Sequence, residues 1–324
     1  MGNITFIKDF VISGFPGLQS RYYGIVSAVL FFVYVCTLMG NAVFMTLFLL
    51  SKSLQKPVYY CIVNLAVCDV LFSTTALPKI ISRYWFEDGS VSFLGCFIQM
   101  FFVHYFGAVT ARLLSVMAID RYAAICFPLR YHSIMTDRNV FILIFGCWIL
   151  GLIGPLMMVI TAYPLPYCAG NTIVHCYCDH IAIIALACTT REDYAQSAFI
   201  NAMIVLLGSL AIIVFSYFAI IVAVLRISSA QGRLKTFSTC SPQLIIIALF
   251  FLPRCFYYAS YYINIVFNIN IKFSADVKVV IIVLYSLLTP MINPFIYCLR
   301  TEELKKILLT KLQRTKIGIK SRRP

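Results

Sequence analysis

Seven long apolar stretches constrain this chain more than any other feature of its sequence. About 20 largely apolar residues are enough to carry a helix across the hydrocarbon core of a bilayer. Backbone exposed to lipid must satisfy its own hydrogen bonds, which favours helices of this length. The sequence therefore predicts an all-α membrane protein, a bundle of seven transmembrane helices, with the spans at 23–50, 58–82, 95–126, 139–163, 197–225, 236–263 and 277–299.

The placement of the charged residues supports this interpretation and gives the orientation of the chain. Only 12% of the residues are charged, about half the share found in soluble domains. Lys and Arg favour the short loops on the cytoplasmic side, and here such loops hold Lys52, Lys56, Arg130, Arg138, Arg226, Arg233 and Lys235. We therefore expect the N-terminus outside and the C-terminus inside. The net charge of +14 is assigned to contact with anionic lipid rather than with nucleic acid.

The chain is expected to have three parts. Residues 1–22 form an extracellular N-terminus, in which Asn3 begins an Asn-Ile-Thr sequon and is the predicted glycosylation site. Residues 23–299 form the bundle. Residues 300–324 form a cytoplasmic amphipathic surface helix and a basic tail, because lysines surround an apolar helix face made of Leu304, Ile307, Leu308 and Leu312.

Five segments spread over most of the chain carry recognisable motifs. Residues 117–131 read MAIDRYAAICFPLRY, and residues 290–300 read PMINPFIYCLR. Shorter matches are PVYYCIVNLAVCD at 57–69, SY at 216–217 and KTFSTC at 235–240. These strings resemble the signature of the odorant (olfactory) receptors, which includes MAYDRYVAICxPLxY and PMxNPxIYxLR. Rhodopsin-like (class A) G-protein-coupled receptors in general share only Asp-Arg-Tyr and Asn-Pro-x-x-Tyr, so the longer strings indicate this subfamily.

The resemblance implies a function and a set of switch residues. An odorant receptor binds a small-molecule odorant at the plasma membrane and activates a stimulatory, olfactory-type G protein, which raises cyclic AMP. Asp120 beside Arg121 also predicts an ion pair at the membrane boundary, where an unpaired charge is costly. By the resemblance, Arg121 is freed on activation to meet the G protein. The residues assigned to coupling and switching are Asp120, Arg121, Tyr122, Tyr217, Asn293, Pro294 and Tyr297.

Several polar side chains fall inside apolar helices, where each needs a partner. The resemblance implies that they converge at the centre of the bundle. Thr110 departs from the family, because odorant receptors commonly carry an acid there. A sodium ion near Asp69 and a purely structural hydrogen-bond network both remain open. The residues concerned are Asn41, Asp69, Thr110, Thr289 and Asn293.

The resemblance also places a ligand site in the outer half of the bundle. The residues expected to face it are Val103, His104, Gly107, Ala108, Asn201, Val205, Phe251, Arg254, Cys255, Tyr258, Tyr285 and Ser286. Arg254 is the most informative of them, because a charge deep in an apolar helix usually faces the interior or a wet cavity. It is interpreted either as the anchor of an anionic ligand such as a carboxylate, or as a side chain that pairs with loop or backbone groups.

The outer loops contain several cysteines. By the family pattern, Cys96 pairs with Cys178 and Cys168 pairs with Cys188, which leaves Cys176 over. Residues 175–180, HCYCDH, also contain the residue types that bind metals. A disulfide at Cys178 removes one thiolate from that set, so no metal site is predicted.

Other function classes find little support in the sequence. The chain has no Gly-rich phosphate loop, no His-Glu-x-x-His motif and no Gly-x-Ser-x-Gly elbow, so an enzyme is not expected. It has no internal repeat of the kind from which many transporters are built. A rhodopsin-like receptor for a different small ligand or a peptide remains as the alternative.

Overall fold

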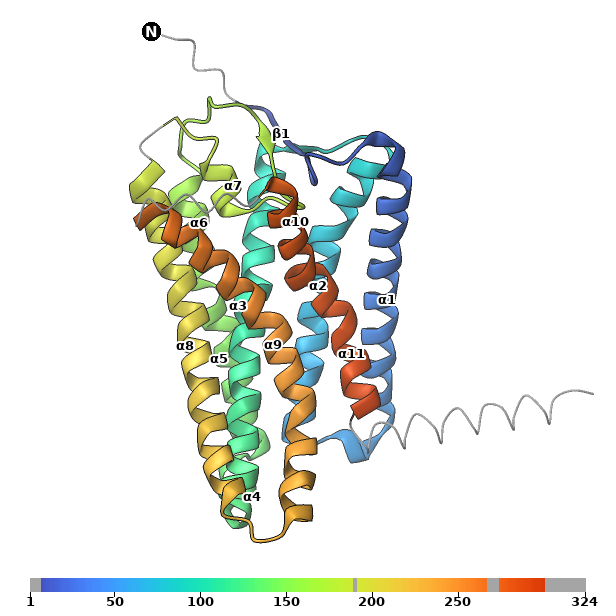
Figure 1. Ribbon diagram of the computed structural model, residues 1–324, viewed down its shortest axis with the longest axis vertical. Helices are drawn as coiled ribbons and strands as arrows, with labels where there is room; N and C mark the ends of the chain where they lie inside the picture. The colour runs from blue at the N-terminus through green and yellow to red at the C-terminus, as the bar shows by residue number, and fades with distance from the viewer. Residues whose placement is uncertain (1–6, 189–190, 267–273, 301–324) are drawn as a thin grey trace, which may run out of the picture.

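The computed structural model describes residues 7–188, 191–266 and 274–300, and it is a bundle of long helices (Figure 1). Within that part of the chain, seven helical spans are long and apolar enough to cross a membrane, which confirms the predicted fold. The spans are α1 (Tyr23–Leu50), α2 (Pro57–Trp85), α3 (Phe93–Cys126), α5 (Asp137–Gly151) continued by α6 (Ile153–Ala162), α8 (Arg191–Leu225), α9 (Ala230–Val266), and α10 (Ala275–Val283) continued through a π-helical turn (Leu284–Leu288) into α11 (Thr289–Arg300).

Local sequence signals set several helix ends. Pro57 occupies the first turn of α2, where its missing N–H costs nothing. Hydroxyl side chains cap three other helices by accepting a backbone N–H from the first turn. These are Ser92 on α3, Thr136 on α5 and Ser274 on α10.

The outer surface of the bundle is apolar. Phe32, Phe145 and Phe215 are each more than 60% exposed, although a soluble protein rarely exposes large apolar patches. Polar side chains such as Asn41 and Asp69 are instead buried inside. This distribution is the one expected when lipid replaces water around the helices.

Several of the helical spans are interrupted along their length. α9 contains Pro242 and Pro253, each of which removes a backbone hydrogen bond, and the helix changes direction along its course (Figure 1). The seventh span passes through the π-helical turn and contains Pro294. Such turns are frequent at functional sites.

A small sheet covers the outer end of the bundle, and the sequence did not predict it. β1 (Asp9–Ile12) pairs antiparallel with β2 (Ser90–Ser92) and parallel with β3 (Thr172–Ile173). Phe10 and Ile12 of β1 are fully buried. Two short helices, α4 (Tyr131–Ile134) and α7 (His180–Ile184), lie in the loops. The predicted glycosylation site Asn3 and the predicted surface helix beyond residue 300 lie outside the described residues.

Candidate ligand-binding site

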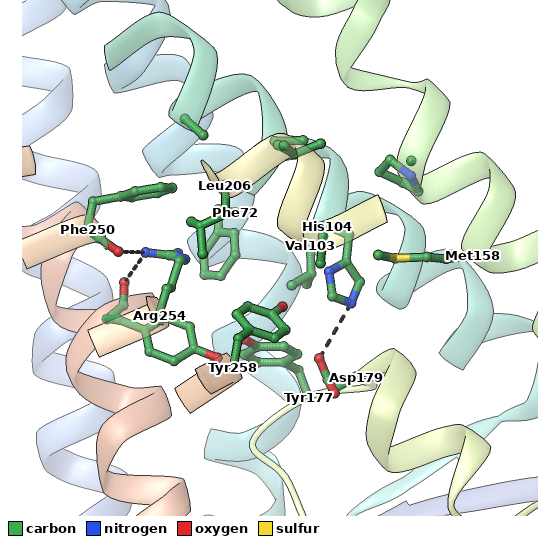
Figure 2. Close-up of a pocket in the computed structure, with 18 residues that line it drawn as sticks. Phe72, Val103, His104, Met158, Tyr177, Asp179, Leu206, Phe250, Arg254 and Tyr258 are labelled. Carbon is green, nitrogen blue, oxygen red and sulfur yellow. Dashed lines mark hydrogen bonds and ion pairs between the residues drawn. The ribbon is translucent and has the colours of Figure 1, made fainter. Parts of the chain in front are cut away.

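A cavity of about 90 Å³ lies between the helices in the outer half of the bundle (Figure 2). Its walls come from α2, α3, α6, α8, α9 and the π-helical turn, and the loop before α7 adds two residues. The lining is mostly apolar and aromatic, with few polar groups, which is typical of small-molecule sites. The lining residues are Phe72, Val103, His104, Gly107, Ala108, Ala111, Gly154, Pro155, Met158, Tyr177, Asp179, Ala202, Val205, Leu206, Phe250, Arg254, Tyr258 and Tyr285.

Most of the predicted ligand-facing residues line this cavity. Those that do are Val103, His104, Gly107, Ala108, Val205, Arg254, Tyr258 and Tyr285. Phe251 and Cys255 do not line the cavity. Phe251 is only 1% exposed, within the apolar core. Ser286 lines a second, smaller cavity instead. The side chain of Asn201 lies outside the described part of the chain.

The lining residues that come from the loop and from α6 were not predicted from the sequence. Tyr177 and Asp179 enter the cavity from the loop, and Met158 enters from α6 (Figure 2). The sequence did contain a signal for the two loop residues, because they are the immediate neighbours of Cys178. Its disulfide with Cys96 holds this part of the loop against the first turn of α3.

Arg254 is the cation of the cavity. Its Nη1 donates hydrogen bonds to the carbonyl oxygens of Phe250, at 2.9 Å, and of Tyr285, at 3.2 Å (Figure 2). The guanidinium carbon lies 3.7 Å from the ring centroid of Phe250 and 4.5 Å from that of Tyr285, within cation–π range. The side chain therefore pairs with backbone groups and also lines the cavity, so the two sequence interpretations are compatible.

Asp179 is the anion of the cavity. Its Oδ1 lies 3.4 Å from His104 Nε2 (Figure 2). Its Oδ2 accepts the backbone N–H of Ile181 at the start of α7, at 3.0 Å. Burial raises the pKa of Asp179, but His104, His175 and His180 outweigh this effect and hold the pKa below its usual range. Asp179 is therefore charged at neutral pH.

His180, beside this carboxylate, is neutral at the same pH. Burial lowers the pKa of His180 to about 4, against the smaller opposing effect of Asp179. Both ring nitrogens of His180 are buried without a hydrogen-bond partner among the described residues. In the same part of the chain, no group of three His, Cys, Asp or Glu side chains is arranged to hold a metal ion.

Both expected disulfides are formed. Cys96–Cys178 joins the start of α3 to the loop over the cavity, and Cys168–Cys188 closes that loop on itself. Cys176 is a buried free thiol. The backbone N–H of Cys178 also donates to Gln99 Oε1 at 2.9 Å, which adds a second attachment between the loop and α3.

The Asp-Arg-Tyr motif lies at the opposite end of α3. Asp120 is buried, and it accepts a hydrogen bond from the Tyr131 hydroxyl at 2.8 Å. The predicted close ion pair with Arg121 is not formed among the described side chains, because neighbouring residues on a helix point in different directions. Arg121 instead acts on Asp120 through its charge at longer range. Tyr122 packs edge-on against Phe127.

Several switch residues have unused hydrogen-bonding groups. Arg121 Nε and the hydroxyls of Tyr217 and Tyr297 are buried without a partner among the described residues. Each such group costs about 1–3 kcal/mol, so a rearrangement that pairs them would be favoured. Pro294 packs closely on α1, since a Cβ added at Gly40 would come within 2.9 Å of its ring.

The polar residues of the bundle centre come together around Asp69. Asn293 Nδ2 donates to Asp69 Oδ2 at 2.9 Å. Asp69, Thr110 and Thr289 line the second cavity, of about 20 Å³. Asn41 is used differently, since its amide donates to the carbonyl oxygens of Thr37, at 2.8 Å, and Pro290, at 3.3 Å. It thereby joins α1 to α11.

Comparison with known proteins shows what the whole chain resembles. A family model described as "Olfactory receptor" matches residues 30–315. Human olfactory receptor 10G7 is 35% identical over 314 residues, which cover 95% of this chain and 96% of that protein. Mouse olfactory receptor 4B13 is 36% identical over 312 residues, 95% of this chain and 97% of that one. Squid rhodopsin shares the fold, with a TM-score of 0.74 at 18% identity over 97% of this chain and 93% of that chain.

Proposed function

Because the chain belongs to the olfactory receptor family, a family of multi-pass receptors and not of enzymes, we propose that it binds a small-molecule odorant in the cavity of Figure 2. We further propose that it acts at the plasma membrane through a stimulatory, olfactory-type G protein and raises cyclic AMP. The observation that carries the proposal is the cavity itself. It is lined by apolar and aromatic groups from six helical spans, and a disulfide-anchored loop covers it.

The charge of Arg254 favours an anionic odorant such as a short carboxylic acid. Both hydrogen bonds that the described structure gives this side chain leave from Nη1. The protons on Nε and Nη2 can therefore bind a carboxylate. The apolar remainder of the cavity suits the hydrocarbon part of the same molecule.

The test is a cyclic AMP assay in cells that express the chain together with an olfactory-type stimulatory G protein. Short carboxylic acids, amino acids and neutral volatiles are screened, and surface levels are measured in parallel. A dose-dependent response establishes the receptor function. A well-displayed protein that stays silent toward every class contradicts the proposed ligand range, and a constant ion current would indicate a channel.

Replacing Arg254 with glutamine should weaken responses to carboxylic acids by about tenfold or more in half-maximal concentration. A charge-assisted hydrogen bond contributes about 1.5–3 kcal/mol, and each 1.4 kcal/mol is a factor of ten. Compared at equal surface level, responses to neutral ligands should change much less. The matched control is Arg112→Gln on α3, because Arg112 also donates to a backbone carbonyl, that of Ala108 at 3.0 Å, but does not line the cavity. Equal losses for acids and neutral compounds would contradict the anchor role.

Replacing Gly107 with leucine should fill the cavity without disturbing the fold. A Cβ at Gly107 meets no heavy atom within 4 Å, and this residue lines the cavity. The exchange also removes a glycine from a helix, which is worth up to about 1 kcal/mol. Surface expression should therefore persist while responses to every ligand fall at least tenfold. Gly146→Leu is the control, since Gly146 is equally open but lies on α5 away from the cavity. Full response in Gly107→Leu would place the ligand elsewhere.

A further inference from the structure

A second cavity lies nearer the middle of the bundle, and two opposite charges line it. It has a volume of about 20 Å³, and among its lining residues only Asp69 and Arg254 are charged. Arg254 lines the ligand cavity as well. Its side chain is therefore part of the wall that the two cavities share.

A positive charge near Asp69 would stabilise its buried carboxylate. Asp69 is 4% exposed, and among the described side chains it receives one hydrogen bond, from Asn293. A buried carboxylate without compensation is costly. The hydroxyls of Ser286 and Thr289, which line the same cavity, donate to the backbone carbonyls of Ile282 and Leu284. They present oxygen lone pairs to the cavity, so its wall is rich in acceptors.

We propose that Arg254 is the built-in counter-charge of Asp69, and that it takes the place of a sodium ion at the centre of this bundle. Both groups line the same small cavity. No direct ion pair joins them in the described structure, and this cavity has room for about one water molecule, which needs about 10–15 Å³. One water can therefore link the guanidinium to the carboxylate.

The oxygens around the cavity suit a sodium ion chemically, but the charge of Arg254 does not. A sodium ion beside Asp69 would share a small, water-poor space with a fixed guanidinium and would be repelled by it. The negative charge of one carboxylate and the positive charge of one guanidinium already cancel. The site is therefore expected to hold its polar network without a cation.

The test is thermal unfolding of the purified full-length receptor in sodium chloride and in choline chloride at equal ionic strength. Wild-type protein is expected to unfold at the same temperature in both salts. Arg254→Leu frees the site, so its unfolding temperature should rise by a few degrees in sodium. The double variant Arg254→Leu/Asp69→Asn should lose this rise. A sodium-specific stabilisation of the wild type overturns the proposal.

A double-mutant cycle provides a second measurement if Arg254→Leu is poorly folded. Asp69→Asn alone leaves a buried, unbalanced guanidinium and should lower the unfolding temperature by roughly 5–10 °C. Adding Arg254→Gln should recover part of this loss, whereas additive losses overturn the pairing. These measurements use no odorant. A failed cyclic AMP screen and a failed counter-charge test are therefore distinguishable.

Discussion

Replacing Arg121 with alanine is expected to abolish the ligand-dependent rise in cyclic AMP without removing the receptor from the cell surface. Arg121 stands at the end of α3 opposite the ligand cavity, and no close ion pair holds it among the described residues. Asp120 accepts a hydrogen bond from Tyr131 instead. Its Nε is buried without a partner among the described residues. The side chain is therefore poised to move toward a partner on this face. The fold should tolerate its loss, since the described structure shows no hydrogen bond from its Nε.

The measurement is a full dose–response curve with surface levels determined on the same cells. Arg138→Ala is the matched control, because Arg138 is an exposed arginine in the first turn of α5 on the same face. It should leave the response near the wild-type level. An unchanged curve for Arg121→Ala would mean that the G protein is engaged through other residues, and the coupling role assigned here would be wrong.

Loss of the Cys96–Cys178 disulfide is expected to prevent the receptor from reaching the cell surface. The bond joins residues 82 positions apart, and closing a loop of that length contributes about 4–5 kcal/mol. It also holds Tyr177 and Asp179, the neighbours of Cys178, in the wall of the cavity. Cys96→Ser should therefore destabilise the outer end of the bundle and release the cover of the ligand site.

Surface staining of intact cells and thermal unfolding of the solubilised protein measure this effect. Cys36→Ser is the control, because Cys36 is a free cysteine on α1, and it should change neither quantity. If Cys96→Ser reached the surface and responded to the same ligand concentrations, the loop would have to be held by its other attachments. Those include the hydrogen bond from Cys178 to Gln99 and the pairing of β3 with β1.

The spans could be predicted because lipid imposes a long apolar signal on each of them. The first apolar stretch, residues 23–50, has the same bounds as α1. Other ends differ where a helix continues beyond the membrane. α8 begins at Arg191, whereas the predicted span begins at residue 197. Charged residues outside the lipid can remain helical, so hydropathy alone does not find such ends.

The ligand site could be predicted in part, for a geometric reason. Phe250, Arg254 and Tyr258 are four residues apart, so they share one face of α9, and all three line the cavity. Phe251 and Cys255 lie one position further along and do not line it. To choose between these two sets of residues, one must know how α9 is rotated about its own axis. Packing against the neighbouring helices determines that rotation. Tyr177 and Asp179 come from a loop whose path has no periodic signal.

The strand β1 has a consequence for how the protein is made. Val11 pairs with Thr172 and Ser13 Oγ donates to the carbonyl of Ile173, so the earliest residues to leave the ribosome pair with a loop made much later. Four of the seven spans lie between them in sequence, and all four must be inserted before the cap can close. Until then, Phe10 and Ile12, fully buried in the finished fold, lack the part of their surroundings that β3 and its loop supply. During biogenesis of this receptor, β1 therefore stays incompletely packed until the loop has been made. Chaperones that shield apolar peptide on the luminal side would act in that interval.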